Sequence, residues 1–137
     1  MLETTTPQIT EYLQRFRRGD RDGAFFGLVE VPHSILPELL SAFHSELDNH
    51  VRDFLVEVIW QHRQDSTIPF LKEALNDVAP AVWKQALDGL VALALAASVE
   101  VLRDARRRQF PTVRKTEEFR RWLDEAIEQA ESQMRRM

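Results

Sequence analysis

The sequence contains no cysteine, and other features that point to common functions are also missing. The lack of cysteine excludes a disulfide framework, thiolate metal sites and thiol catalysis, and it is compatible with a reducing cytosol, so we expect a cytoplasmic protein. The four glycines form no phosphate-binding loop. The longest apolar run, residues 90–97, is far shorter than the ~20 residues of a membrane span. The first residues lack the basic region and apolar run of a signal peptide.

Positive charge is scarce in most of the chain. Residues 1–102 carry 8 Lys/Arg and 15 Asp/Glu, a net charge of −7, whereas residues 103–137 carry 10 and 7, a net charge of +3. An acidic body argues against wrapping a nucleic-acid backbone, which requires a strongly positive surface. The arginine cluster at 106–108 has two interpretations: contact with an acidic partner, or a solvated helix end that complements the helix dipole.

Recognisable catalytic motifs are absent. The four histidines, at positions 33, 44, 50 and 62, form neither an H-E-x-x-H motif nor the paired Glu-x-x-His of di-iron bundles. No serine lies in a nucleophile elbow, and carboxylate pairs such as Asp53 with Glu57 are more typical of exposed helix faces. We therefore predict a non-catalytic protein with no metal ion and no cofactor.

What the sequence does contain is a repeat with the length of a helical hairpin. Residues 51–56 align with residues 82–87 at an offset of 31, and the same offset aligns residues 68–74 with 99–105. An offset of 32 aligns residues 36–39 with residues 68–71. A recurring period of this size with helical patterning indicates stacked helix pairs.

Apolar residues spaced at i, i+3, i+4 and i+7 predict eight helices and no strand. Polar residues at the expected helix starts are interpreted as caps. These are Thr6, Ser34, Asp48, Ser66, Ser98 and Thr116. Residues 109–113 are interpreted as a linker before the last helix. The apolar stripe of that helix consists of Phe119, Trp122, Leu123, Ala126, Ile127, Ala130 and Met134.

A few residues are assigned to the core or to helix contacts. We expect Trp60 and Trp122 in the core. For Trp83, at the start of its helix, core packing and partial exposure at an interface both stay open. Gly27 and Gly89 are expected to allow close contact between helices.

Residues 48–52, with apolar residues at Leu55, Val56 and Ile59, resemble the start of a HEAT repeat. In that family the first helix opens with a turn acid, a Val-Arg pair and spaced apolar residues. The second copy departs from the pattern because Trp83 stands where arginine is usual. The resemblance covers residues 34–108. It implies a right-handed α-superhelix of antiparallel helix pairs, with first helices on the convex side and second helices on the concave side, where a ligand often binds.

The resemblance selects a surface on the second helices. Its residues are expected to face outward, and they are Glu38, Ser41, Lys72, Glu73, Asn76, Arg103, Arg106 and Arg107. We interpret six of them as partner-binding residues: Lys72, Glu73, Asn76, Arg103, Arg106 and Arg107. The alternative is a plain solvated face, since every amphipathic helix has one.

The length fits a single domain, residues 1–137, in which residues 112–137 form a C-terminal capping helix. Small bacterial proteins similar to HEAT repeats include adaptors and toxin-immunity proteins, so the favoured function is a module that binds another protein, away from any membrane. Self-association through the last helix is a further possibility. The alternative is a nucleic-acid-binding or base-repair protein of the HEAT-like DNA glycosylase type, against which the net charge argues. A third hypothesis is an enzyme subunit that resembles phycobilin lyases with HEAT-like repeats, but no residues of the sequence support it.

Overall fold

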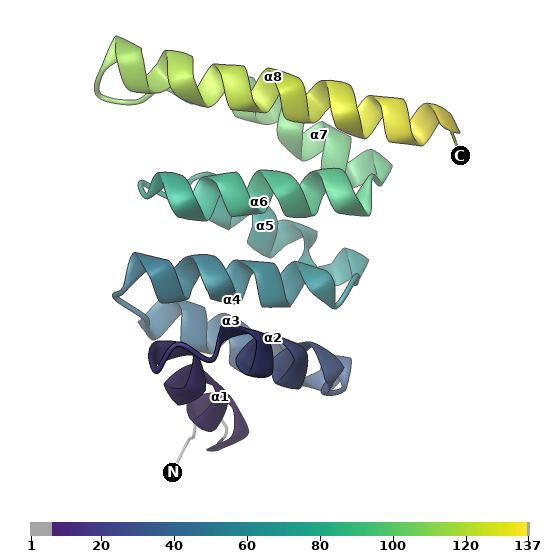
Figure 1. The fold of residues 1–137 in the computed structure, drawn as a ribbon. Helices are drawn as coiled ribbons and strands as arrows, with labels where there is room; N and C mark the ends of the chain where they lie inside the picture. Colours follow the sequence, from purple (N-terminus) through teal and green to yellow (C-terminus); the bar gives the residue numbers. More distant parts are fainter. Residues whose placement is uncertain (1–6, 137) are drawn as a thin grey trace. The chain divides into compact units, whose positions relative to one another are not determined.

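The computed structural model describes residues 7–136. Over this range the chain forms eight α-helices and three short 3-10 helices, with no strand (Figure 1). The predicted all-α class is confirmed. The chain divides into two compact units, Met1–Gln64 and Asp65–Met137, which are described one at a time. A single domain over the whole chain stays a prediction.

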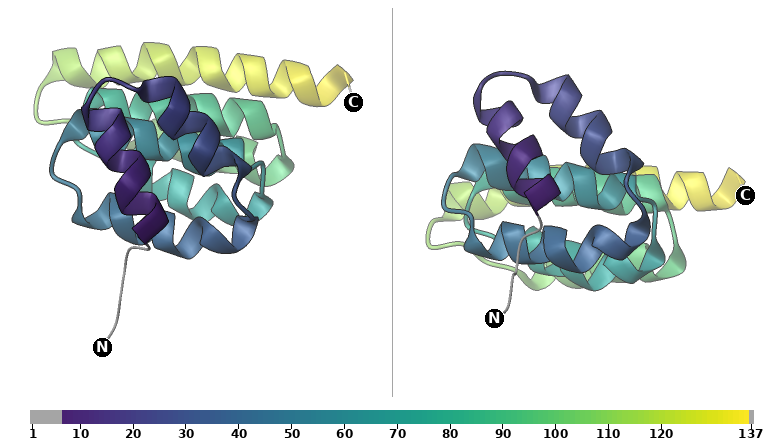
Figure 2. Two further views of the ribbon diagram at one scale, coloured as in Figure 1. Left: turned by 60° about the horizontal axis from the view of Figure 1, so that its bottom comes forward. Right: turned by 90° about the horizontal axis from the view of Figure 1, so that it is seen from below.

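The first unit contains four α-helices in two hairpins. In order, its elements are α1 (Pro7–Arg17), α2 (Arg21–Glu30), η1 (His33–Ile35), α3 (Leu36–Ser45) and α4 (Asn49–Gln61). Helix α1 packs against α2, as both views in Figure 2 show, and α3 packs against α4. The turn after α1 passes through Gly19 at φ +97°, a conformation that favours glycine. Phe16 and Phe54, with ring centroids 4.1 Å apart, join α1 to α4.

Gly27 makes the close helix contact that was expected. A Cβ at this position would lie 2.2 Å from a ring carbon of Tyr12, so only glycine lets the α1 ring lie against α2. Gly89 is buried in the helix Pro80–Leu93, and its expected role in close helix contact stays a prediction. Two other expectations in this part of the fold are wrong: Glu38 and Ser41 on α3 do not face fully outward, because both are half-buried.

The second unit contains four α-helices, of which the last is the longest. Its elements are η2 (Asp65–Thr67), α5 (Ile68–Leu75), α6 (Pro80–Leu93), α7 (Ala96–Asp104), η3 (Ala105–Arg107) and α8 (Val113–Arg136). Helix α6 packs against α5, α7 and α8, and α5 also contacts α7. Because neighbours cover α6 on several sides, it buries Val82, Trp83, Ala86, Leu87 and Leu90.

Helix α8 lies along α6 and α7 and buries one apolar stripe against them. The buried residues are Phe119, Leu123, Ala126, Ile127 and Ala130. Two residues assigned to this stripe leave the core: Trp122 is 44% exposed and Met134 is 36% exposed. Met134, near the end of α8, borders a pocket that α8 forms with Ala96 and Val99 of α7. Trp60 is buried as expected, and Trp83 is buried at 2% exposure.

The predicted caps are correct at one position and wrong at four. Asp48 Oδ1 accepts a hydrogen bond of 2.8 Å from the backbone N–H of His50, so Asp48 caps α4. Ser34 and Ser66 instead lie inside 3-10 turns. Ser98 lies inside the first turn of α7, where its Oγ accepts a bond from the N–H of Leu95. Helix α8 begins before Thr116, and Thr6 lies outside the described residues.

Within residues 7–136, no helix has both the length and the apolar character that crossing a membrane requires.

Candidate functional site

All six predicted partner-binding residues lie on the second unit, and all six are exposed. They do not form one continuous set, however. Lys72, Asn76 and Arg107 face a pocket between α5 and α7, whereas Arg103 faces a different pocket between α7 and α8. The arginines of α7 and η3 therefore point toward two neighbouring helices.

The α5–α7 pocket has a volume of about 270 Å³. Helix α5 contributes Lys72 and Leu75, and Asn76 follows at its C-terminus. The remaining lining residues come from α7, from η3 and from the residue after η3, and they are Val101, Asp104, Ala105, Arg107 and Arg108. Its apolar floor and polar rim combine the two kinds of contact found in protein-binding sites.

The charges of the α5–α7 pocket are unbalanced. Its lining includes three cations, Lys72, Arg107 and Arg108, and one carboxylate, Asp104. Within the described part of the chain, the side chains of Lys72 and Arg107 have no ion-pair partner, so their charges face solvent. Asn76 Nδ2 donates a bond of 3.1 Å to the Lys72 carbonyl, which fixes the C-terminal turn of α5. The pocket thus favours an anionic group.

Arg108 has a positioning role in this pocket. Its guanidinium donates to the carbonyls of Leu75, at 2.6 Å, and Asp77, at 2.7 Å, which lie at the C-terminal end of α5 and just after it. The group also lies 4.0 Å from the ring centroid of Phe110 and 5.2 Å from that of Phe119. Burial lowers the pKa of Arg108, and the Asp77 carboxylate opposes that shift. Arg108 is therefore neither a solvated helix end nor a free contact for a partner, the two interpretations of its cluster.

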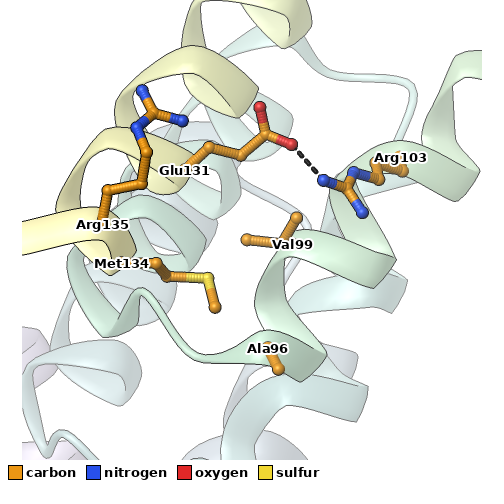
Figure 3. A pocket seen from close by; sticks show the side chains of 6 residues that line it. All are labelled: Ala96, Val99, Arg103, Glu131, Met134 and Arg135. Atoms are coloured by element: carbon orange, nitrogen blue, oxygen red, sulfur yellow. Dashed lines mark hydrogen bonds and ion pairs between the residues drawn. The ribbon is translucent and has the colours of Figure 1, made fainter. Parts of the chain in front are cut away.

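The α7–α8 pocket is larger, about 360 Å³, and Figure 3 shows its lining. Arg103 and Glu131 form an ion pair across it, and Arg135 lies beside them on α8. The hydrogen bond from Arg103 holds the pKa of Glu131 below its usual range. Ala96, Val99 and Met134 supply the apolar part of the lining.

Arg106 also faces α8. Its Nε lies 3.8 Å from a carboxylate oxygen of Asp124, and its carbonyl accepts a hydrogen bond from Arg120. Glu73 is exposed and lines neither pocket. Since Arg103 and Arg106 have acidic neighbours, Lys72 and Arg107 carry the uncompensated charge of this face.

The described residues contain no group of three His, Cys, Asp or Glu side chains that could hold a metal ion. The nearest approach between histidines joins His33 and His62, whose Nδ1 atoms lie 3.0 Å apart. Two imidazoles without a third protein ligand do not make the three- or four-ligand site typical of zinc.

A family model for HEAT repeats matches residues 36–119, more than half of the chain. The chain belongs to the HEAT repeat family. The matched range begins at α3, includes the α5–α7 pocket and ends within α8. HEAT repeats commonly mediate protein–protein interaction. A search of curated proteins and a search of solved structures found no match.

Sequence reasoning missed several residues of this HEAT repeat surface. The sequence assigns no role to Glu131, which pairs with Arg103, or to Asp104, which lines the α5–α7 pocket, and it does not predict that Arg108 fixes the end of α5. The roles of Glu131 and Arg108 depend on contacts between residues that lie 28 and 33 positions apart in the chain, Arg103 with Glu131 and Arg108 with Leu75. The repeat offset of 31 carried a signal for such contacts, because it places the end of one second helix beside the next.

Proposed function

We propose that this HEAT repeat protein is a non-catalytic module that binds an acidic surface of another protein, as an adaptor or toxin-immunity protein does. The α5–α7 pocket is the proposed contact. The single observation that supports it most is the meeting of Lys72 and Arg107, from helices far apart in the chain, at one pocket where neither has an ion-pair partner among the described residues.

Charge supports a protein rather than a nucleic acid as the partner. The second unit, residues 65–137, carries 12 Lys/Arg and 12 Asp/Glu, and the whole chain has a net charge of −4. A nucleic-acid backbone requires many cations on one face. Here two of the cations on the predicted face, Arg103 and Arg106, have carboxylates beside them. A cytoplasmic location is part of the same proposal.

The apolar part of the pocket also suits a protein partner. Leu75 is buried and Val101 is half-buried, so a side chain that enters between the two cations meets apolar surface below them. Interfaces between proteins combine such a core with a polar rim, and rim charges increase the association rate more than the affinity.

The test compares two charge-reversed variants with the same change in net charge. Lys72→Glu with Arg107→Glu alters the α5–α7 pocket, whereas Arg114→Glu with Arg121→Glu alters two exposed cations of α8 outside the pocket. Proteins captured from native lysate by the wild type are identified by mass spectrometry, and the association rate of the recovered partner with each variant is then measured by stopped-flow mixing at two salt concentrations.

We expect the pocket variant to lose about tenfold in association rate and to show a weaker salt dependence, as the removal of electrostatic steering predicts. The α8 variant should bind like the wild type. Equal binding by the wild type and the pocket variant would contradict the proposal and favour a plain solvated face.

A further inference from the structure

Trp122 is the most bulky side chain that the second unit leaves exposed. The residue is 44% exposed on α8, although Phe119, Leu123 and Ala126 beside it are buried. A tryptophan left in water forgoes the free energy of burying a large apolar area, and tryptophan is enriched among the residues that dominate protein interfaces. An exposed tryptophan therefore indicates a second contact with a partner, and the residues around Trp122 show what kind of group it would bind.

Trp122 borders a shallow groove between α6 and α8, with a volume of about 100 Å³. The other residues that line this α6–α8 groove are Leu87, Asp88 and Val91 from α6, and Glu125, Ala126 and Gln129 from α8. Leu87 and Ala126 are buried and form its floor, whereas Asp88 and Glu125 are exposed at its rim. The groove belongs to a different pair of helices from the α5–α7 pocket.

The charge of the α6–α8 groove is opposite to that of the α5–α7 pocket. Its two ionisable lining residues, Asp88 and Glu125, are both carboxylates, one from each helix. Lys84 lies at the Trp122 end of the groove, and its Nζ is also 3.7 Å from the Glu118 carboxylate, so its charge is already balanced. A ligand that is complementary to the groove carries positive charge.

The chain itself shows that this ring accepts a cation. The ammonium of Lys84 lies 4.5 Å from the centroid of Trp122, within the range of a cation–π contact. A carboxylate pair beside an indole is the combination that a guanidinium or ammonium requires: the ring face attracts the charge, and the oxygens accept its hydrogen bonds.

We propose that the α6–α8 groove binds a partner protein through an arginine or lysine side chain that is flanked by an apolar residue. The cation lies between Trp122 and the carboxylates of Asp88 and Glu125. The apolar neighbour covers Leu87 and Val91 on the floor and wall of the groove. This contact is independent of the proposed function, which assigns an acidic partner surface to the α5–α7 pocket.

The experiment uses the full chain and a blocked pentapeptide that carries one arginine between two leucines. The indole N–H signals of the three tryptophans are followed by NMR during titration, and the signal of Trp122 is identified by its loss in Trp122→Phe. A matched pentapeptide with glutamate in place of arginine is the control. We expect the arginine peptide to shift the Trp122 signal in a saturable way and the glutamate peptide to leave it unchanged.

Two variants separate the contributions. Asp88→Asn with Glu125→Gln leaves the buried floor intact and should weaken the arginine peptide about fivefold, in line with exposed charge pairs. Trp122→Ala, with binding followed at backbone amides of α8, should weaken it about tenfold or more, as for an interface tryptophan. Glu128→Gln removes an exposed α8 carboxylate outside the groove and should leave binding unchanged.

Equal shifts with both peptides, no shift with either, or equal affinity in the wild type and the Asp88→Asn, Glu125→Gln variant would each overturn the proposal. Sedimentation velocity tests a second copy of the chain as the occupant. A concentration-dependent dimer that disappears in Trp122→Ala would assign the groove to self-association and would also overturn it.

Discussion

At the scale of single residues, His62 is a buried ionisable group of the first unit with a contact at each ring nitrogen. It is buried, its Nε2 lies 3.0 Å from the Leu28 carbonyl, and its Nδ1 lies 3.0 Å from Nδ1 of His33. Because a carbonyl only accepts, Nε2 carries a hydrogen and donates it. In the neutral form Nδ1 then accepts from His33, so both ring nitrogens are satisfied without any charge.

This environment makes the stability of the fold depend on pH. Burial lowers the pKa of His62, the bond to Leu28 opposes that shift, and the nearby His33 adds to it. The unfolded chain takes up a proton near the ordinary histidine pKa of about 6.5, which the folded chain resists. The contribution of His62 to stability is therefore complete above pH ~6.5 and is lost as the pH falls through the lowered folded value.

We predict that the free energy of unfolding falls as the pH drops below about 7, with a slope of at most about 1.4 kcal/mol per pH unit from this one proton. Urea denaturation at a series of pH values measures it. His62→Gln should flatten the profile, whereas His44→Gln, which removes an exposed histidine, is the control. An unchanged profile in His62→Gln would assign the pH dependence to other groups.

The tryptophans show how far single residues can be assigned from sequence. Trp60 was correctly placed in the core, but Trp122 was not. It follows Phe119 by three residues, which puts it about 60° around the helix, at the edge of the buried stripe. For Trp83 the sequence allows either core packing or exposure; it is buried, because Phe119 of α8 packs on it with ring centroids 5.0 Å apart. The spacing of apolar residues within one helix does not show which of its residues a neighbouring helix will cover.

At the scale of helices, the repeat was more informative than the caps. Residues 36–39 and 68–71 align at an offset of 32, and both segments begin a helix that has a proline in its first turn and a 3-10 turn before it. The sequence pattern predicts that Ser34 and Ser66 are helix caps. In both cases the 3-10 turn places the serine two residues before its helix. The alignment correctly predicts that α3 and α5 are equivalent helices, but it does not predict the 3-10 turn before each of them.

Asp48 offers a test of the one cap that was correct. Asp48→Ala removes the acceptor for the His50 N–H at the start of α4 and should destabilise the protein by about 0.5–2 kcal/mol. Ser66→Ala is the matched control, since Ser66 is exposed and the N-cap of α5 is Thr67. Its effect should stay within about 0.5 kcal/mol, as for an ordinary surface change. Chemical denaturation at pH 7 measures both, and equal effects would show that the Asp48 bond does not contribute.

At the scale of the whole molecule, the two proposals assign contacts of opposite sign to the second unit. The α5–α7 pocket has two unpaired cations among the described residues, and the α6–α8 groove has two carboxylates beside an exposed indole. The HEAT repeat architecture was predictable because it depends on helix spacing and repeat length. The two surfaces were only partly predictable, because each combines residues from separate helices: Lys72 and Arg107 were assigned, whereas Asp88, Trp122 and Glu125 were not.

Both surfaces depend on α7 or α8, so the role of α8 as a C-terminal cap deserves a direct test. Its buried stripe includes Phe119, Leu123 and Ile127, which contribute roughly 5–9 kcal/mol at 1.5–3 kcal/mol per buried side chain. That is comparable with the whole stability of a typical domain, about 5–15 kcal/mol. We predict that a chain ending at Pro111 exposes Trp83 and Leu102 and aggregates or changes its oligomeric state in size-exclusion chromatography, with a red shift of tryptophan emission. A chain that ends at Gln133 keeps the stripe and is the control. If the shorter chain stays monomeric and as stable as the full chain, α8 is not a cap.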